Sequence, residues 1–359
     1  MSVVGGDVTG GERSTLVAQT EAFMRQIVTD AEATARGRTL GDADLPLYDV
    51  IRYHLGWVDE QFIENAADPG KRIRLSICLL STGAAGGDPE KAIPVAAAIE
   101  LLHNFTLMHD DIQDRSELRR GRQTVWRRWG EAQAINAGDA TFALSQIALF
   151  KSAERGIDGE TMSNLATEFN GMTLQIVEGQ VLDLGFAERW DVGVDDYLRM
   201  IGGKTAAIVA FAAWSGAVFA GRDPNTCRRF HDFGQLLGLG FQIRDDYLGI
   251  WGDAQSTGKQ PGDDIRGRKQ SIPLIMLSES LTDTGLAQLR EIYRKQNLSE
   301  SDVQHVTRLL SENDIPERVQ ALTTEYHDRA ISVLGEVAEP GEARDALTML
   351  AERLVDRSR

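Results

Sequence analysis

One segment limits the possible folds more than any other. Residues 92–114, AIPVAAAIELLHNFTLMHDDIQD, are apolar at nearly every position and then end abruptly in carboxylates. A helix that is apolar nearly all round is buried in a protein core, so we expect this segment to deliver its acidic end to an internal cavity. A chain built on such a helix must surround it with further apolar elements.

The rest of the sequence supplies those elements as helices. Long segments with helical periodicity cover roughly residues 133–153, 160–187, 194–220, 224–251 and 272–294. The sequence shows neither sustained period-two alternation nor an internal repeat. It therefore predicts an all-α fold, a helical bundle around a central deep cavity. We expect the Gly-rich residues 1–13 to be a flexible leader and residues 14–359 to form a single domain.

Charge and composition exclude several classes of partner. Asp and Glu total 54 against 38 Lys and Arg, which gives a net charge of −16 and argues against nucleic acid as a partner. Neither a signal-peptide pattern nor a run of about 18 uncharged apolar residues is present, so we expect a cytoplasmic protein without stable membrane insertion. Cys78 and Cys227 show neither metal-ligand nor redox-pair spacing, and we interpret both as structural thiols.

Two carboxylate clusters follow apolar helices. Asp110, Asp111 and Asp114 are spaced so that the first and last share one helix face. Asp245 and Asp246 end the apolar segment FGQLLGLGFQIRDD. Carboxylates this close repel one another unless a cation lies between them, and oxygen-only ligands suit Mg²⁺, which takes its remaining ligands from water and substrate phosphates. A single cluster is equally well read as a solvated helix end; two of them favour a metal site facing a phosphorylated substrate.

Short basic runs supply the cations that an anionic substrate needs in an acidic protein. They are Gly70-Lys71-Arg72-Ile73-Arg74, Arg119-Arg120-Gly121-Arg122, Gly203-Lys204-Thr205 and the segment from Lys259 to Lys269. Arg binds phosphate oxygens bidentately and Lys adds a flexible point charge, so mixed clusters can clamp a diphosphate. Each run in isolation is more simply a solvated surface. The Gly-Lys-Thr lacks the first glycine and the preceding strand of a P-loop.

Together these motifs resemble the trans-type isoprenyl diphosphate synthases, the polyprenyl synthetase family, from about residue 66 to 275. D-D-I-Q-D at 110–114 precedes R-R-G at 119–121, and F-Q-I-R-D-D-Y-L-G at 241–249 precedes G-K-Q-P-G-D-D-I-R-G-R-K-Q-S-I-P at 258–273. Upstream, G-K-R-I-R at 70–74 and His103 match the family's site for isopentenyl diphosphate. The resemblance implies the isoprenoid synthase fold, a prenyltransferase of isoprenoid biosynthesis and a homodimer.

The resemblance also implies a role for individual residues. Three Mg²⁺ ions are expected on the allylic diphosphate, held by Asp110, Asp111, Asp114, Asp245 and Asp246. The same diphosphate is expected to contact Arg119, Lys204, Lys259 and Lys269. The diphosphate of isopentenyl diphosphate is expected to bind Lys71, Arg74, His103 and Arg120. The oxygens of Thr205 and Gln242 are expected to face positive charge that develops along the allylic chain.

The chemistry agrees with this assignment. Breaking the allylic C–O bond of a C5, C10 or C15 diphosphate leaves a carbocation and a diphosphate, which metal ions and cations stabilise. Isopentenyl diphosphate attacks through its double bond, and a proton is then lost to the released diphosphate. The sequence departs from the family's pattern at Pro69, Leu75, Trp126 and Gly249. At position 249 many relatives have the last aspartate of the second motif.

Phe105 is the predicted determinant of product length. The chain should grow along the helix that carries the first motif, where one turn of about 5.4 Å is close to one isoprene unit. Phe105 lies five residues before Asp110, and a ring at this position resembles geranylgeranyl diphosphate synthases of the archaeal type. We therefore expect the C20 product. The alternative is that Phe105 packs sideways and another helix forms the floor.

Other functions are compatible with part of the pattern. A farnesyl (C15) or longer-chain synthase would share every motif. A class I terpene cyclase would share D-D-x-x-D but carries a different second motif and needs no isopentenyl diphosphate site. A non-catalytic regulatory subunit usually loses one aspartate motif, whereas both motifs here keep their leading aspartates. A plain helical interaction protein would not explain why carboxylates and cations follow one family's order.

Overall fold

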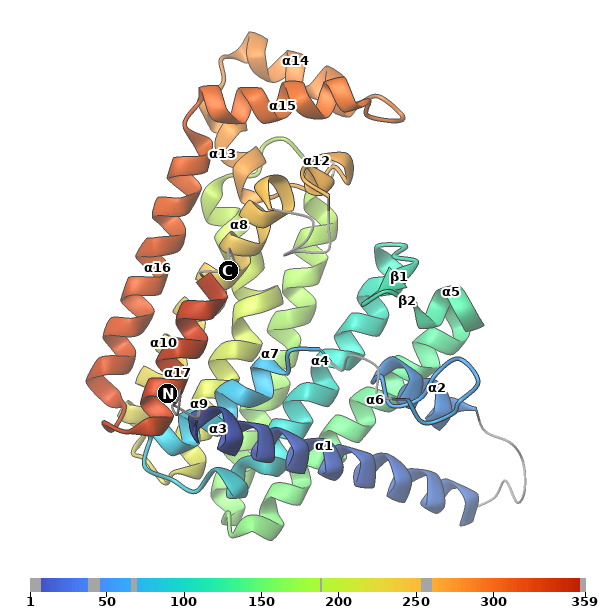
Figure 1. The fold of residues 1–359 in the computed structure, drawn as a ribbon, viewed down its shortest axis with the longest axis vertical. Coiled ribbons are helices and arrows are strands. Elements are labelled where there is room, and N and C mark those ends of the chain that lie inside the picture. Colours follow the sequence, from blue (N-terminus) through green and yellow to red (C-terminus); the bar gives the residue numbers. More distant parts are fainter. Residues whose placement is uncertain (1–7, 38–45, 66–69, 188, 253–259, 356–359) are drawn as a thin grey trace, which may run out of the picture. The chain divides into compact units, whose positions relative to one another are not determined.

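The computed structural model describes residues 8–37, 46–65, 70–187, 189–252 and 260–355, and most of them are helical (Figure 1). The expected all-α class is therefore confirmed. The chain packs as two compact units, residues 1–167 with 215–222, and residues 168–214 with 223–359. Two of the boundaries between these units fall inside helices. The single domain expected from the sequence stays a prediction, and α1 begins at Val8, inside the expected leader.

The first unit is centred on the apolar segment that ends in the first aspartate cluster. Its elements are α1 (Val8–Ala35), α2 (Leu47–His54), α3 (Ile73–Ala84), α4 (Ile93–Gln113), β1 (Leu118–Arg119), β2 (Arg122–Gln123), α5 (Val125–Trp129), α6 (Glu131–Phe150) and the start of α7 (Gly159–Phe186). The N-terminal half of α4 is almost entirely buried, and α4 packs most extensively against α6. The β1–β2 hairpin follows the C-terminal end of α4 (Figure 1).

The second unit is centred on α10. Its elements are the rest of α7, α8 (Val194–Ile201), the π-helical turn η4 (Gly202–Ala206), most of α9 (Ala207–Phe219), α10 (Pro224–Trp251), α12 (Asp263–Arg266), α13 (Ile272–Ser280), α14 (Asp283–Tyr293), α15 (Glu300–Glu312), α16 (Ile315–Val337) and α17 (Glu342–Val355). Helix α16 runs alongside α10, and α14 and α15 lie at one end of α16 (Figure 1). Asp223 caps α10 by accepting bonds from the amides of Asn225 and Thr226.

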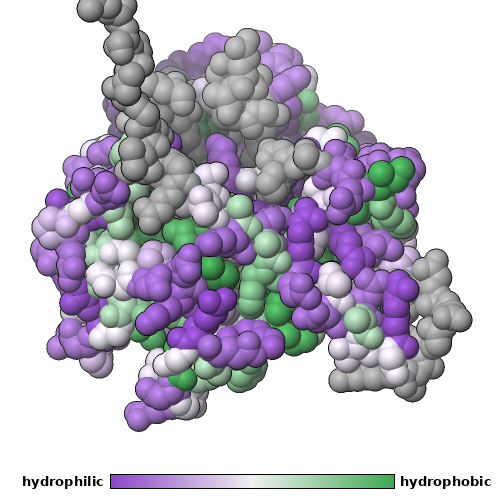
Figure 2. Space-filling view, turned by 60° about the horizontal axis from the view of Figure 1, so that its bottom comes forward, coloured by the Kyte–Doolittle hydropathy of each residue, from purple (hydrophilic) through white to green (hydrophobic). Residues whose placement is uncertain are grey.

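Most of a long apolar stretch belongs to the second unit. Among the described residues, Val194–Phe219 is apolar enough by length and composition to cross a membrane, and 72% of its apolar window is buried in the structure. That burial is what a core helix shows. The face drawn in Figure 2 is mainly hydrophilic, with smaller hydrophobic patches between the polar residues.

Candidate active site

The first aspartate cluster lies at the C-terminal end of α4. Asp110 lies in its last turn and Asp114 caps it. Asp111 is only 1% exposed, and Nε of Arg119 donates to both of its oxygens, at 2.9 Å to Oδ1 and 3.0 Å to Oδ2. Burial raises the pKa of Asp111, although Arg119 opposes the shift. The cluster thus combines one buried, paired carboxylate with a half-buried and an exposed one.

A two-residue hairpin positions the arginines that follow this cluster. Leu118 pairs with Gln123 and Arg119 with Arg122, so Arg120 and Gly121 form the turn. Their φ angles are +52° and +74°, the geometry that a tight hairpin turn requires at both central positions. Arg119 is therefore fixed on Asp111 while Arg120 projects from the tip.

Arg120 brings two of the predicted basic runs together. A Cβ atom at Gly70 would lie 2.7 Å from Nη2 of Arg120, and the φ of +84° at this position favours glycine. Burial and then the charges of Arg74 and Arg120 hold the pKa of His103 well below its usual range. Arg74, His103 and Arg120 thus surround one electropositive location in which the imidazole stays neutral.

Two residues of this region were missed by sequence reasoning. His54, at the end of α2, lines a small cavity together with Asp111, Arg119 and Arg120. Burial and the nearby arginines lower the pKa of His54 to about 3. Arg72 is 5% exposed and forms ion pairs with Glu100 and Glu21 at 2.7 Å and 2.8 Å.

The sequence offered only a weak signal for either of them. His54 precedes the basic run by more than fifteen residues, and Arg72 sits inside that run as one more cation. The buried pairing of Arg72 anchors the loop that carries Lys71, which is itself exposed.

The second aspartate cluster has a different chemistry around its buried member. Asp246 is 7% exposed and accepts bonds from Tyr197 Oη at 2.6 Å, Gln242 Nε2 at 3.0 Å and the amide of Ile272 at 3.2 Å. These donors are neutral, and burial together with the charge of Asp264 raises the pKa of Asp246 to about 6. Asp245, its neighbour on α10, is half-buried.

A chain of hydrogen bonds extends from this carboxylate. Thr205 donates to Gln242 Oε1 at 2.9 Å, and Gln242 donates to Asp246. Thr205 belongs to the π-helical turn η4, a distortion that often occurs at functional sites. Lys204, in the same turn, pairs with Asp183 of α7.

Glycines allow η4 to approach α7 closely. A Cβ atom at Gly203 would lie 2.5 Å from the carbonyl oxygen of Gln175, and one at Gly179 would overlap the backbone of Lys204. The turn that carries Lys204 and Thr205 therefore packs backbone to backbone against α7.

Lys269 adds a cation to the second cluster. Its Nζ lies 3.6 Å from Oδ1 of Asp264. Burial acts to lower the pKa of Lys269, but the carboxylates of Asp264, Asp246, Asp245 and Asp183 outweigh burial and raise it. Lys259 lies outside the described residues, as does Pro69.

The donor chemistry of both clusters suits Mg²⁺. Their ligating groups are carboxylate oxygens without adjacent thiols, the donor set that this ion prefers. Among the described residues no group of three His, Cys, Asp or Glu side chains is arranged to hold a metal on its own. A substrate diphosphate would supply the remaining oxygens, as is usual for Mg²⁺.

A comparison with known families decides between the readings of this site. The sequence model of the polyprenyl synthetase family matches residues 56–310, about 70% of the chain and all the predicted site residues. The chain belongs to the polyprenyl synthetase family. The resemblance inferred from its motifs is thereby confirmed.

Curated relatives of this family member extend the match. A short chain isoprenyl diphosphate synthase of Methanothermobacter thermautotrophicus is 36% identical over 87% of this chain and 99% of its own. A geranylgeranyl diphosphate synthase of Mycobacterium tuberculosis is 39% identical over 74% of this chain and 75% of its own. A (2E,6E)-farnesyl diphosphate synthase of Mycobacterium bovis is 35% identical over 86% and 85%. The expected enzyme class, an isoprenyl diphosphate synthase, is confirmed.

A solved structure supports the fold of the family member independently. The crystal structure of a polyprenyl synthetase from Streptomyces coelicolor matches with a TM-score of 0.80 and 35% identity, over 93% of this chain and 98% of the other. The isoprenoid synthase type of fold is therefore confirmed.

The ring of Phe105 lies between α4 and α6 in this synthetase. Its centroid is 4.8 Å from that of His109 and 5.4 Å from that of Phe142 on α6. The ring is half-buried rather than fully enclosed. Its predicted role as the floor stays a prediction.

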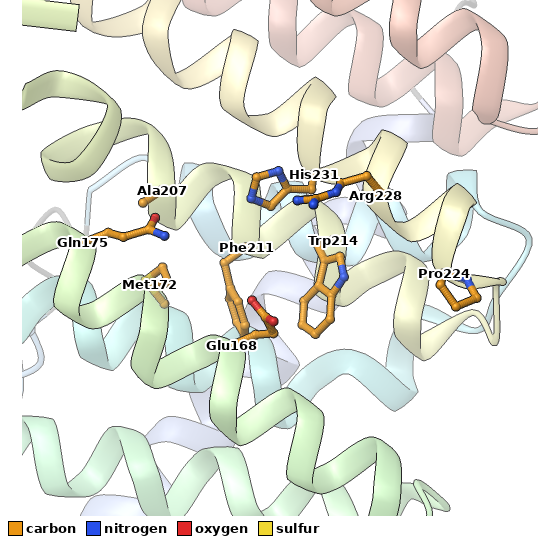
Figure 3. Close-up of a pocket in the computed structure, with 9 residues that line it drawn as sticks. All are labelled: Glu168, Met172, Gln175, Ala207, Phe211, Trp214, Pro224, Arg228 and His231. Carbon is orange, nitrogen blue, oxygen red and sulfur yellow. The ribbon is translucent and has the colours of Figure 1, made fainter. Parts of the chain in front are cut away.

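A further cavity of about 200 Å³ in the second unit contains none of the predicted site residues (Figure 3). Met172 and Gln175 line it from α7, Phe211 and Trp214 from α9, and His231 from α10. His231 precedes Asp245 by fourteen residues on α10, or about 21 Å of helix. The His231 side of this cavity is therefore remote from the second aspartate cluster, whereas Gln175 and Ala207 line it beside the η4 turn.

Proposed function

We propose that this chain is a short-chain trans-prenyltransferase that condenses isopentenyl diphosphate with allylic diphosphates, with geranylgeranyl diphosphate as its product. The observation that carries the proposal is the layout of α4. His103 and Asp110 are seven residues apart, on the same helix face and about 10 Å from each other. One helix would thus present a diphosphate-binding location beside a metal-binding one, as a reaction between two diphosphates requires.

The location around His103 is the proposed site of isopentenyl diphosphate. Lys71, Arg74 and Arg120 would neutralise its diphosphate, with the Arg side chains binding bidentately. The lowered pKa of His103 leaves a neutral imidazole, which can donate one hydrogen bond without adding another repelling cation. The proximity of Arg120 to Gly70 supports this set, because it brings residues of two separate basic runs together.

The allylic diphosphate would bind at the aspartate clusters. Asp110, Asp114 and Asp245 are the proposed direct ligands of Mg²⁺, with three ions in the loaded site. Asp111 and Asp246 would act mainly by position, since both are buried and already hydrogen bonded. The remaining diphosphate oxygens would be bound by Arg119, Lys204, Lys259 and Lys269.

Ionisation of the allylic substrate is the step these residues would assist. Bound Mg²⁺ would supply Lewis-acid stabilisation of the departing diphosphate. Lys204 and Lys269 would add fixed positive charge there. Thr205, whose proton is directed at Gln242, would turn its oxygen lone pairs toward the allylic cation. After attack by isopentenyl diphosphate, the released diphosphate would accept the proton, so a separate protein base is not required.

The product length is proposed from Phe105. Its position five residues before Asp110 favours C20, whereas its contact with Phe142 is compatible with a ring turned toward α6 and another helix as the floor. Relatives named for C15 and C20 products match this chain about equally well. A C15 or longer product is therefore the alternative outcome of the assay.

A cytoplasmic homodimer is also proposed. Leu174, Val177, Val181 and Leu184 form an apolar stripe on α7, each exposed by 46–64%. Such a stripe on a helix typically marks a protein interface. Sedimentation or light scattering of Val181→Glu should then report a larger monomer fraction than for the unchanged protein.

The deciding assay is incubation with Mg²⁺, isopentenyl diphosphate and each of the C5, C10 and C15 allylic diphosphates, followed by sizing of the dephosphorylated products. Geranylgeraniol is the expected product, and Phe105→Ala should shift it to longer chains. A cyclic hydrocarbon formed from an allylic diphosphate alone would identify a terpene cyclase instead. Absence of any product from a folded protein would favour a regulatory subunit.

A further inference from the structure

The cavity in the second unit takes no part in the proposed reaction, yet its lining has the composition of a binding site (Figure 3). Its apolar wall consists of the buried side chains of Met172, Ala207 and Phe211 and the half-buried Trp214. The rings of Phe211 and Trp214 lie 5.5 Å apart. A cavity of about 150 Å³ is large enough for benzene. The volume of about 200 Å³ therefore admits one ring with a few further atoms.

Side chains of both charges face this cavity. Glu168 reaches it from α7 and Arg228 from α10, and both are exposed (Figure 3). The third ionisable group is His231, whose pKa is lowered first by burial; Arg228 lowers it further, whereas Asp232 and Glu168 oppose the shift. The imidazole is therefore neutral at pH 7. Within the described part of the chain, Glu168 and Arg228 form no ion pair with each other. A ligand with one ammonium and one carboxylate group would pair with both, since Arg binds carboxylates bidentately.

One wall of the cavity is shared with the η4 turn. The side chain of Gln175 points into the cavity, while a Cβ atom at Gly203 would lie 2.5 Å from the carbonyl oxygen of Gln175 (Figure 3). Ala207, also in the lining, directly follows η4. A molecule in the cavity would therefore contact both of the backbone segments that pack together at this turn. A shift of α7 at Gln175 would then also move the turn that carries Lys204 and Thr205.

We propose that this cavity is a second ligand site, which binds a small zwitterion with one apolar ring, and that its occupancy is coupled to the diphosphate site through η4. The ring would lie against Phe211 and Trp214, the carboxylate would pair with Arg228, and the ammonium group with Glu168. An aromatic amino acid has this chemistry. The binding itself is independent of the proposed prenyltransferase function, whereas the coupling rests on it.

The cavity stays accessible in the proposed dimer. Met172 and Gln175 precede Leu174 and Val177 by two residues each, which corresponds to about 200° around α7. The cavity therefore lies on the side of α7 away from the apolar stripe.

The test of binding uses three probes that differ only in charge. L-Phenylalanine carries both groups, phenethylamine only the ammonium group, and phenylpropionate only the carboxylate. Calorimetric titration of the full chain with each probe gives the three dissociation constants. Glu168→Gln and Arg228→Gln remove the proposed partners, and Trp214→Ala removes a ring. Arg229→Gln is the matched control, because Arg229 is the next residue of α10 but pairs with Glu336.

We expect L-phenylalanine to bind more tightly than either single-charge probe. Glu168→Gln and Arg228→Gln should each weaken its binding about threefold or more, the effect of a solvent-exposed ion pair. Trp214→Ala should weaken it about tenfold through the lost ring contact. Trp214→Phe keeps a ring and should recover most of that loss, and it gives the comparison if Trp214→Ala does not fold. Arg229→Gln should match the unchanged protein.

The coupling has its own measurement. The dissociation constant of L-phenylalanine is determined with and without Mg²⁺ and inorganic pyrophosphate, which occupy the diphosphate site. We expect it to change about twofold or more, and L-phenylalanine should change the affinity for pyrophosphate by the same factor, because coupling between two sites is reciprocal. A constant that pyrophosphate leaves unchanged would overturn the coupling.

Three results would overturn the binding site. They are the absence of binding of all three probes at millimolar concentration, equal binding of a single-charge probe and L-phenylalanine, and equal effects of Arg228→Gln and Arg229→Gln. If the unchanged protein elongates normally in these cases, the proposed function stands and only this inference fails. If the protein binds L-phenylalanine as expected but elongates no primer, the proposed function and the coupling fail, and the binding site stands.

Discussion

In both aspartate clusters one aspartate is buried and its neighbour is more accessible, but the buried aspartate has a different kind of hydrogen-bond partner in each. In each Asp-Asp pair the first residue, Asp110 or Asp245, is half-buried, and the second, Asp111 or Asp246, is buried and hydrogen bonded. Asp111 is held by the charged fork of Arg119, whereas Asp246 is held by neutral donors such as Tyr197. Each D-D motif therefore contains a candidate metal ligand, Asp110 or Asp245, and a buried structural aspartate, or anchor, Asp111 or Asp246. The hydrogen-bond partner of the anchor determines how strongly the anchor's contribution to stability depends on salt and pH.

The charges that surround the two clusters also differ. In the first unit, arginines gather so densely that burial and their charges force His54 and His103 to stay neutral. Around the second cluster, burial and then the charge of Asp264 raise the pKa of Asp246, and nearby carboxylates raise the pKa of Lys269 although burial opposes that shift. The positive charge of the first region therefore favours binding of an anion, and the negative charge of the second favours binding of a cation.

The largest expected effect separates ligand from anchor. Asp110→Asn and Asp245→Asn should each lower the elongation rate by about 10³-fold, because a charge that stabilises the leaving diphosphate is lost. Their melting temperatures should stay within a few degrees of the unchanged protein, since neither side chain is fully buried. Asp191→Asn, a 74% exposed aspartate paired with Arg189, is the control and should change neither quantity. An equal loss of stability in these three variants would contradict the distinction between ligand and anchor.

The anchors should show the opposite pattern. Asp111→Asn and Asp246→Asn should each lower the free energy of unfolding by about 1–3 kcal/mol, because buried donors lose an acceptor. High salt should reduce the loss for Asp111, whose partner Arg119 is charged and 31% exposed, but not that for Asp246. Urea unfolding in EDTA at low and high salt measures both. The contrast between the clusters is wrong if the two variants respond to salt alike.

The main helices and most of the candidate site residues could be predicted from the sequence, because they depend on local sequence patterns. The apolar run before Asp110 predicted a buried helix with an acidic end, and the spacing of the basic runs predicted cations near it. The anchors could not be predicted, since the Tyr197–Asp246 bond joins residues 49 positions apart. The glycine at 249 and the extra aspartate pair at 263–264 were both visible, but only tertiary packing shows that Asp264 fills the space at Gly249.

The smallest expected effect is a pair of opposite pH dependences. The pKa of His54 is lowered from 6.5 to about 3, so the unfolded state binds more protons below pH 6.5 and His54 costs stability as pH falls. The pKa of Asp246 is raised from 3.8 to about 6, so the folded state binds more protons and Asp246 adds stability as pH falls through 6. Between pH 7 and 5 each amounts to about 1–2 kcal/mol, and in the unchanged protein they partly cancel.

Single and double variants separate these two contributions. On acidification from pH 7 to 5 in EDTA, His54→Gln should lose less melting temperature than the unchanged protein, and Asp246→Asn should lose more. The difference should be a few degrees in each case, since about 1–2 kcal/mol shifts a chain of this size by that amount. The double variant should return close to the unchanged profile, because one cost and one gain are both removed. Shifts in the same direction for both single variants would mean that the two regions are not electrostatic opposites.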